Sequence, residues 1–181
     1  MHTISSLATN PALRQKSREL TDLEIRSPKI KKLIADMKKL LSKEQYGVAL
    51  AAVQVGEPLR LFIVSGRALA RDSRNAPDEP NKKEEVPALP DQVFINPKLL
   101  KLSRKREKKH EGCLSIRGKW GEVPRAEKAT LQYLDERGDK QTRGASGFLA
   151  HIFQHEMDHL EGILYIEKAV ALYDEPAEKD G

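Results

Sequence analysis

Apolar residues recur at helical spacing over residues 28–43 of this 181-residue chain. They lie three or four positions apart, as one face of an α-helix requires: Ile30, Leu33, Ile34, Met37, Leu40 and Leu41. Pro28 suits the first turn of a helix, and Ser27 suits the N-cap before it. The pattern therefore predicts an amphipathic helix over residues 28–43.

Three shorter stretches predict β-strands, at residues 59–64, 92–97 and 129–134. Pro97 is expected to stop the second strand, because proline cannot donate a ladder hydrogen bond. The third stretch alternates apolar and polar residues, and the turn at residues 135–138 leads into a hairpin partner.

A polar, proline-containing stretch at residues 67–91 predicts a surface insertion that is flexible or weakly ordered. The final predicted helix runs from about Ser146 to Leu160, with Gly162 just past its end as the C-cap. We therefore expect an α+β fold in which small mixed or antiparallel sheets pack around a C-terminal helix. No repeat or boundary divides residues 1–181, so one domain is expected.

Composition agrees with a small soluble enzyme, since 39% of the residues are hydrophobic and 33% are charged. No apolar run approaches the roughly 20 residues of a membrane span. The formal net charge is +5, and its excess lies at residues 31–32, 38–39 and 104–109. A solvated surface explains these cations; the alternative is non-specific electrostatic contact with RNA or a ribosome surface.

The chain has one cysteine, Cys113, which excludes an internal disulfide and is typical of a reducing compartment. Residues 1–15 lack the apolar segment of a secretory signal, although their few acidic residues leave an organellar presequence open. We expect a cytoplasmic monomer with no membrane contact and no sequence-specific nucleic-acid partner.

The most informative motif is an H-E-x-x-H sequence formed by His155, Glu156 and His159. Positions i and i+4 of a helix share a face, so the two imidazoles can bind one metal ion. Glu156 can reach a water beside that ion without being a ligand, which is the placement of a general base.

A catalytic site of this kind usually needs a third protein ligand. In metzincin proteases a third histidine follows at a fixed spacing, but this chain has Tyr165 there. A more distant glutamate needs another helix, and only 22 residues follow His159, ending in the polar run of residues 174–181. The other candidate is Cys113, whose thiolate would bind zinc or iron strongly.

Three segments together resemble the peptide deformylase family. The sequences Glu111-Gly112-Cys113-Leu114-Ser115 and Gln154-His155-Glu156-Met157-Asp158-His159 are similar to its second and third motifs. Residues 47–54 are similar to its first motif, G-Φ-G-Φ-A-A-x-Q with Φ apolar, except that Ala49 replaces the second glycine. The motifs occur in the family's order, and the similarity covers residues 30–166.

The resemblance implies a hydrolase that removes the formyl group from the N-terminal formylmethionine of newly made polypeptides. Cys113, His155 and His159 would hold one divalent ion. The family implies Fe²⁺ in the cell, and Zn²⁺, Ni²⁺ or Co²⁺ in purified protein. By resemblance, the side-chain amide of Gln54 and the backbone N–H of Leu114 would stabilise the oxyanion.

Substrate contacts are expected where small residues let a peptide backbone approach and where apolar residues form a methionine pocket. The expected residues are Gly47, Val48, Ala49, Gly112, Phe148, His151 and Ile152. Trp120 is a candidate for the pocket rim. If residue 49 needs a positive φ, the Ala49 methyl strains the backbone; if it lies under the substrate, the methyl narrows the site.

Glu111 and Asp158 are candidates to orient the ligands, because metal-bound histidines usually donate their second N–H to a carboxylate or carbonyl. Arg125 is expected to pair with one of them. Two alternatives to the deformylase remain. One is a zinc peptidase with a third ligand other than Cys113; the other is a weakly active or inactive relative, because of Ala49.

Overall fold

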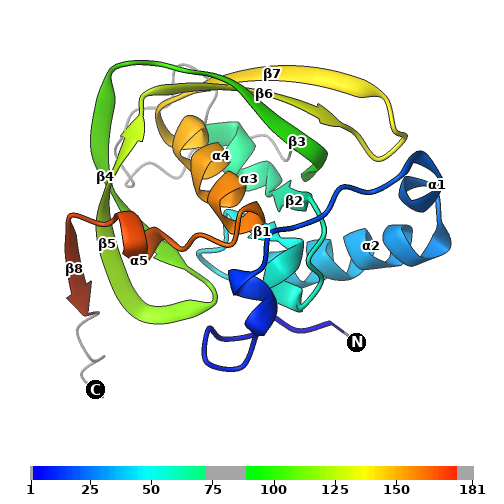
Figure 1. Ribbon diagram of the computed structural model, residues 1–181, viewed down its shortest axis with the longest axis horizontal. Helices are drawn as coiled ribbons and strands as arrows, with labels where there is room; N and C mark the ends of the chain where they lie inside the picture. The colour runs from blue at the N-terminus through cyan, green and yellow to red at the C-terminus, as the bar shows by residue number, and fades with distance from the viewer. Residues whose placement is uncertain (1, 72–88, 175–181) are drawn as a thin grey trace.

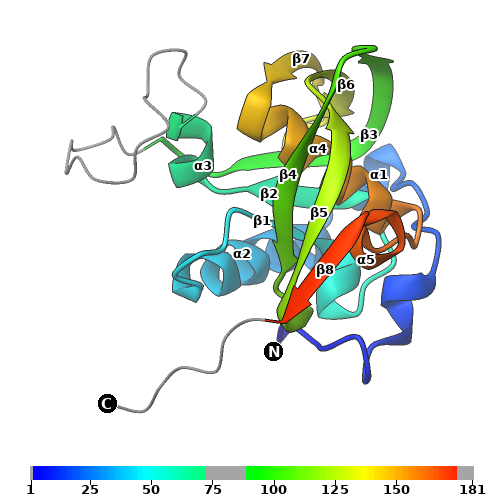
Figure 2. The same cartoon turned by 90° about the vertical axis from the view of Figure 1, so that its left-hand side faces the viewer.

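The computed structural model describes residues 2–71 and 89–174. Two antiparallel sheets enclose one long helix, as Figures 1 and 2 show from two directions. This confirms the predicted α+β fold with sheets around the C-terminal helix. Within the described residues, no helix is both long and apolar enough to span a membrane.

The larger sheet has five strands in the order β1-β2-β3-β6-β7. Their bounds are β1 Ala49–Ala51, β2 Leu61–Val64, β3 Gln92–Leu102, β6 Lys128–Leu134 and β7 Lys140–Ser146. The smaller sheet has the order β4-β5-β8, with β4 Arg106–Cys113, β5 Ile116–Ala126 and β8 Ala171–Asp174. In Figure 2 this second sheet stands in front of the helix that carries the H-E-x-x-H sequence.

The helices are mostly short apart from two. The 3₁₀ segments are η1 Pro11–Arg14 and η2 Ala52–Val55. The α-helices are α1 Asp22–Ile25, α2 Pro28–Lys43, α3 Gly66–Arg71, α4 Gly147–Leu160 and α5 Tyr165–Lys168. Helix α2 has the predicted bounds, and the hydroxyl of Ser27 accepts a hydrogen bond from the Ile30 N–H at 3.3 Å as its N-cap.

Strand alternation divides the core between α2 and α4. Successive side chains of a strand point to opposite faces, so β1, β2 and β3 contribute to two apolar clusters. The cluster on the α4 side includes Phe62, Val64, Phe94 and Phe153. The cluster on the α2 side contains Leu50, Leu61, Ile63, Val93 and Ile95, together with Leu33 and Met37. Both faces of these strands are buried, and α4 is held firmly against the sheet.

Strand β3 differs from the prediction, because it continues past Pro97 to Leu102. Its register with β6 shifts between Ile95 and Lys98, and Asn96 has a φ of 48° at this bulge. The Asn96 side chain holds the bend by bonding both backbone groups of Leu20, at 2.8 and 2.7 Å. The bulge accommodates a residue without an N–H, so Pro97 bends the strand and does not end it.

The prediction of an insertion at residues 67–91 was wrong at its start. Helix α3 occupies Gly66–Arg71, and Ala68, Leu69 and Ala70 are buried. The Asp91 carboxylate accepts a hydrogen bond from the Gly66 N–H at 2.9 Å, so both ends of the segment meet. The remainder of the predicted insertion, residues 72–88, lies outside the described residues.

The end of α4 matches the prediction closely. Gly162 has a φ of 74°, which favours glycine. The N–H groups of Gly162 and Ile163 bond the carbonyls of His159 and Asp158, at 3.1 and 2.9 Å, as in a Schellman motif. A Cβ at residue 162 would lie 2.8 Å from the Arg14 carbonyl oxygen, so the chain just after α4 packs closely against the backbone of Arg14.

Candidate metal centre and active site

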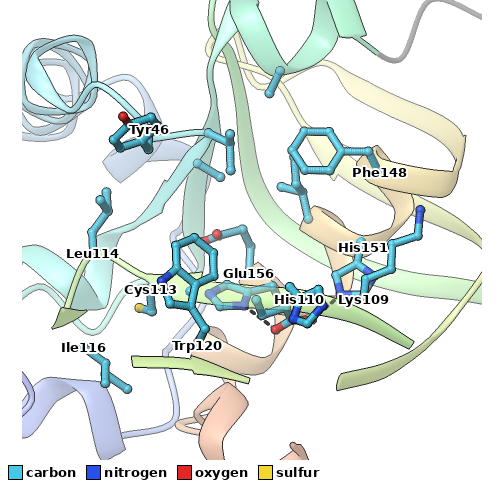
Figure 3. A pocket seen from close by; sticks show the side chains of 18 of the residues that line it. Tyr46, Lys109, His110, Cys113, Leu114, Ile116, Trp120, Phe148, His151 and Glu156 are labelled. Carbon is cyan, nitrogen blue, oxygen red and sulfur yellow. Dashed lines mark hydrogen bonds and ion pairs between the residues drawn. The ribbon is translucent and has the colours of Figure 1, made fainter. Parts of the chain in front are cut away.

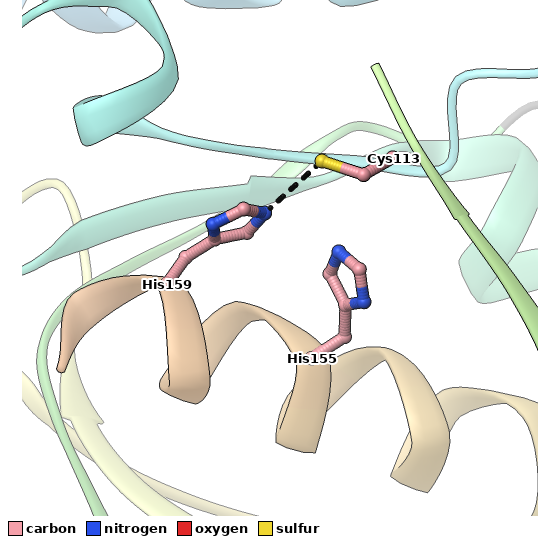
Figure 4. A group of neighbouring side chains, drawn as sticks. All are labelled: Cys113, His155 and His159. Atoms are coloured by element: carbon pink, nitrogen blue, oxygen red, sulfur yellow. Dashed lines mark hydrogen bonds between the residues drawn. The ribbon is translucent and has the colours of Figure 1, made fainter. Parts of the chain in front are cut away.

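Helix α4 places His155 and His159 on one face, one turn apart. Their ring centroids lie 4.9 Å apart. Both rings point toward Cys113, which lies at the end of β4 and faces the helix (Figure 4). The Cys113 Sγ is 3.3 Å from His159 Nε2. The three possible ligand atoms lie within 4.8 Å of one another, so the cluster can hold one metal ion.

Cys113 reaches this position because the ladder is irregular at the end of β4. The pairing of β4 with β5 shifts between Glu111 and Cys113, and Cys113 then pairs with Ile116 across a tight turn. Two imidazoles and one thiolate make up the three protein ligands that a catalytic divalent site usually has. The donor set therefore fits a catalytic divalent ion.

Tyr165, at the position of the third metzincin histidine, is not part of the cluster. Its ring stacks on His155 with centroids 6.0 Å apart, and its hydroxyl donates to the Lys119 carbonyl at 2.9 Å. The role of Tyr165 is therefore to pack against a ligand. This geometry argues against the metzincin pattern.

The electrostatics of the cluster favour a thiolate. Burial alone would raise the pKa of Cys113, but the adjacent His159 and His155 lower it to about 5. Burial likewise opposes a charge on His155, yet contacts with Cys113 and Glu111 raise its pKa well above the usual value. The protein thus keeps Cys113 in the form that binds metal.

Glu111 holds the first histidine ligand in place. Its Oε2 accepts a hydrogen bond from His155 Nδ1 at 2.8 Å, which leaves Nε2 of that ring for the metal. Arg125 donates to both Glu111 oxygens at 2.7 and 3.0 Å, and His151 Nε2 also contacts Oε1. Burial would raise the pKa of Glu111, but the donors from His151, His155 and Arg125 lower it far below its usual range. The carboxylate stays ionised although it is buried.

Asp158 extends this network to the far side of Arg125. Arg125 Nη1 donates to Asp158, and Lys168 Nζ donates to the other Asp158 oxygen at 2.6 Å. Arg125 thus pairs with both carboxylates that the sequence offered for it. The network joins β4, β5, α4 and α5 behind the metal-binding cluster.

Glu156 is buried beside the cluster and is not one of its three ligand residues. Burial raises the pKa of its carboxyl group, although His155 and His159 partly offset the effect. Its Oε2 is buried and has no hydrogen-bond partner among the described residues. An unpaired carboxylate oxygen at this place is available to a water molecule in the cavity.

Gln54 lies in η2, with its side-chain amide beside Cys113, and is 2% exposed. Its Oε1 accepts a hydrogen bond from the Ala51 N–H at 2.9 Å, so the orientation of its amide is fixed. Its Nε2 points toward Cys113 Sγ at 3.5 Å and Ser115 Oγ at 3.3 Å. Ser115 was not among the residues predicted for the site, although it lies in the second motif.

A cavity of about 540 Å³ opens in front of these groups, as Figure 3 shows. All residues predicted for substrate contact line it: Gly47, Val48, Ala49, Gly112, Phe148, His151 and Ile152. Gln54, Cys113, Leu114, His155 and Glu156 line it as well. Trp120 lies across Gly112, where a Cβ would come within 3.1 Å of its ring. The cavity therefore borders both Cys113 and His155 and all the residues that were predicted to contact the substrate.

Five cations around the cavity were not predicted as site residues: Arg67, Arg71, Lys109, Arg117 and Lys119. Arg67 donates to the carbonyls of Glu44 and Gln45, at 3.0 and 3.2 Å. Arg117 pairs with Glu44 at 2.9 Å and Lys119 pairs with Asp174 at 2.6 Å. Their positions depend on long-range packing, which no short motif encodes.

The structure decides between the two predicted effects of the Ala49 methyl group, backbone strain and a narrower site. Ala49 lies in β1 opposite Val64, and Asn96 is the one non-glycine residue with a positive φ in the described chain. The methyl group therefore causes no backbone strain. It lies against the cavity and is 6% exposed, which leaves the second alternative, an effect on the space for the substrate.

Fold and site together fit a metal-dependent hydrolase, with a cysteine–histidine cluster that can hold a metal ion beside a cavity of about 540 Å³. The family model described as polypeptide deformylase matches residues 3–175. The chain is 35% identical over 173 residues to the peptide deformylase of Finegoldia magna, covering 96% of this chain and 93% of that protein. It is 41% identical over 143 residues to the peptide deformylase of a Roseiflexus species, covering 78% and 74% of the two chains.

Solved structures agree. The peptide deformylase of Thermotoga maritima superposes with a TM-score of 0.75 and 28% identity, covering 94% of this chain and 99% of that one. A Met-Ala-Ser-bound class I type b peptide deformylase from Acinetobacter baumannii gives 0.76 and 30%, covering 93% and 98%. The chain therefore belongs to the polypeptide deformylase family, whose members are metal-dependent enzymes that remove N-formyl groups.

Proposed function

We propose that this chain removes the formyl group from the N-terminal formylmethionine of newly made polypeptides. The observation that carries the proposal is that Glu156 and Gln54 line one cavity together with Cys113 and His155, two of the three residues of the candidate metal cluster. This arrangement offers a metal-binding set, a base and an amide donor around one small space.

Cys113, His155 and His159 would hold one divalent ion. Such an ion supplies Lewis acidity to a carbonyl oxygen and lowers the pKa of a nearby water. We propose Fe²⁺ in the cell, with Zn²⁺, Ni²⁺ or Co²⁺ able to replace it, because thiolate and imidazole suit all four. Glu111 supports this set by fixing the tautomer of His155 through the 2.8 Å hydrogen bond.

Glu156 would serve as the general base. Its unpaired Oε2 would accept a proton from the attacking water and later pass that proton to the leaving amine. The raised pKa of Glu156 brings proton affinity closer to what this exchange needs. Burial keeps bulk water from competing for the carboxylate.

Gln54 and Leu114 would stabilise the oxyanion of the tetrahedral intermediate. The Gln54 amide is held by the Ala51 N–H and needs little reorganisation when charge develops. Leu114 follows Cys113 directly and lines the same cavity, so its backbone N–H would be the second donor. Both donors lie next to Cys113 and would meet at one developing charge.

The substrate would lie along β1 with its methionine side chain between Val48, Phe148 and Ile152. Ala49 has little bulk at Cβ, so a peptide backbone can approach β1. Gly47 and Gly112 would border the same path, although a Cβ on them would meet Glu44 and the Trp120 ring and not the substrate. His151 would border the same pocket. The bound Met-Ala-Ser peptide in the Acinetobacter baumannii relative supports a site that accepts a short N-terminal peptide.

We also place the protein in the cytoplasm, where nascent formylated chains occur, and propose an electrostatic contact with the ribosome. The exposed cations Arg104 and Arg106 support that contact. Lys105 supports it less, since it pairs with Glu107 and Glu127 at 3.2 and 3.3 Å.

The test is release of formate from a formyl-Met-Ala-Ser peptide by protein loaded anaerobically with Fe²⁺. Wild type should turn over, whereas Glu156→Gln should retain its metal and lose nearly all activity, because the charge is needed for proton transfer. Glu19→Gln, which makes the same change at an exposed glutamate that does not line the cavity, is the matched control and should remain active. No turnover by metal-loaded wild type, or full turnover by Glu156→Gln, would refute the proposal.

A further inference from the structure

The N-terminal segment of residues 5–10, which we call the N-terminal strap, lies behind two walls of the cavity. The Ser5 N–H donates to the Gln54 carbonyl at 2.9 Å. The Leu7 N–H donates to the Ser115 carbonyl, also at 2.9 Å. The strap therefore bonds directly to the segment that carries the Gln54 amide and to the one that follows Leu114.

Asn10 is the side chain that anchors this strap. Its Nδ2 donates to the Val53 carbonyl at 2.7 Å, one residue before Gln54. Its Oδ1 accepts from the Ala12 N–H at 3.0 Å and caps η1. Asn10 is 5% exposed, so both ends of its amide are fixed in a buried environment.

These contacts close a ring around the candidate oxyanion donor. Gln54 Nε2 reaches Ser115 Oγ at 3.3 Å, Ser115 is bonded to the strap through its carbonyl, and the strap returns to Val53 through Asn10. The position of the Gln54 amide thus depends on a segment more than 40 residues away in sequence.

We infer that Asn10 is a positioning residue that holds Gln54 in the orientation its catalytic role requires. The inference rests on the proposed function, since it assigns a purpose to the Gln54 amide. Asn10 bonds the backbone beside Gln54 and acts only through it. Small displacements of an oxyanion donor reduce the rate of the chemical step more than they reduce substrate affinity.

Asn10→Asp is the informative variant. The aspartate keeps the oxygen that caps η1, but it loses the donor to the Val53 carbonyl and puts a negative charge against it. We expect kcat to fall about tenfold, with KM and metal content unchanged. Thr9→Ala changes an exposed neighbour in the same strap and should leave kcat unchanged.

A second background separates positioning from general structural support. In Gln54→Ala protein the Asn10→Asp change should alter kcat by less than about twofold, because the group that it positions is absent. An equal loss of kcat in both backgrounds would overturn the inference. So would a loss that appears in KM or in metal content.

A readout independent of turnover is the pair of Gln54 side-chain amide signals in ¹⁵N-labelled protein, identified by their loss in Gln54→Ala. Asn10→Asp should shift them, and Thr9→Ala should not. Unshifted signals in folded Asn10→Asp protein would overturn the inference. Wild type that shows no deformylation would refute the proposed function instead, while the amide signals still decide whether Asn10 positions Gln54.

Discussion

Arg125 offers the sharpest test of how the fold supports the metal centre. Its guanidinium donates to both oxygens of Glu111 and to Asp158. The side chains of Arg125 and Glu111 are each 4% exposed, and that of Asp158 is 13% exposed. Arg125→Met keeps most of the volume and leaves two carboxylates buried without this partner.

Removing one partner of a buried ion pair costs about 3–5 kcal/mol, because an uncompensated charge remains. In a chain of this length each kcal/mol lowers the melting temperature by roughly 2–4 °C. Arg125→Met should therefore lower the melting temperature by roughly 6–20 °C at pH 7. Glu111 keeps its contacts with His151 and His155, so we expect the lower half of that range.

The pH dependence has a definite sign. The pKa of Glu111 is lowered in the folded protein, so its ion pair stabilises the fold above the unfolded pKa of about 4.5. That stabilisation is lost as pH falls toward the folded pKa. The deficit of Arg125→Met should consequently be largest at pH 7 and should shrink below the pH at which Glu111 of the variant takes up a proton, because loss of Arg125 raises the folded pKa of Glu111 while the wild-type carboxylate stays ionised.

Thermal unfolding followed by circular dichroism on metal-free protein measures this directly. The control is Lys119→Met, which removes an ion pair with Asp174 whose side chains are 52% and 81% exposed. Exposed pairs contribute about 0–1 kcal/mol, so the control should melt within a few degrees of wild type. An Arg125→Met melting temperature within 2 °C of wild type, or a deficit independent of pH, would refute the reasoning.

Three further predictions concern the cavity. Gln54→Ala should lower kcat about 10²–10³-fold with little change in KM, and wild-type turnover would show that Gln54 is merely packed core. Ala49→Gly should keep or raise kcat/KM while costing about 0.5–1 kcal/mol of strand stability, and a marked fall in kcat/KM would mean that the methyl group helps the substrate to bind. In metal-free protein, alkylation of Cys113 by iodoacetamide should follow a pKa of about 5, with the reactive thiolate present above it. A midpoint near 9 would contradict the assigned contacts with His155 and His159.

The two long helices could be predicted because their signals are local. The apolar face of α2 and its Ser27–Pro28 start lie within a few turns, and the structure has the predicted bounds. Gly162 likewise marks the end of α4, because only a residue that tolerates a positive φ fits there. Such signals do not depend on how distant segments pack.

Strand β3 and helix α3 show where local signals fail. Pro97 would end the strand if the neighbouring strand needed an N–H donor at this position. The bulge at Asn96 removes that need. Helix α3 belongs to a segment whose overall composition is polar, yet its first residues include three that are buried. In both places tertiary contacts decide the outcome, and they come from residues distant in sequence.

The candidate site shows the same division. His155 and His159 lie at a helical spacing that indicates a shared metal, whereas the choice of Cys113 needed the resemblance to a family. The contact of Gln54 with Ser115 had no local signal, because 61 residues separate them. Pairing of Arg125 with Glu111 was expected, but its extension to His151 appears only when β4 and α4 come together.

Charge balance gives an independent reason for a divalent ion in this centre. Within the described residues, the connected groups carry four negative charges when ionised: Glu111, Asp158, Glu156 and the Cys113 thiolate. Arg125 and Lys168 are their two permanent cations. Four negative and two positive charges give these groups a net charge of −2, which a divalent ion among the three ligands would neutralise.

Without a metal ion, protons on these side chains neutralise part of this net negative charge. Burial disfavours a charged His155, yet its contacts with Cys113 and Glu111 raise its pKa well above the usual value, and burial also raises the pKa of Glu156. Metal binding should therefore displace protons from these groups. Calorimetric titration of Zn²⁺ in two buffers of different ionisation enthalpy should show net proton release, and its absence at pH 7 would mean that protons do not compensate the charge of the metal-free centre.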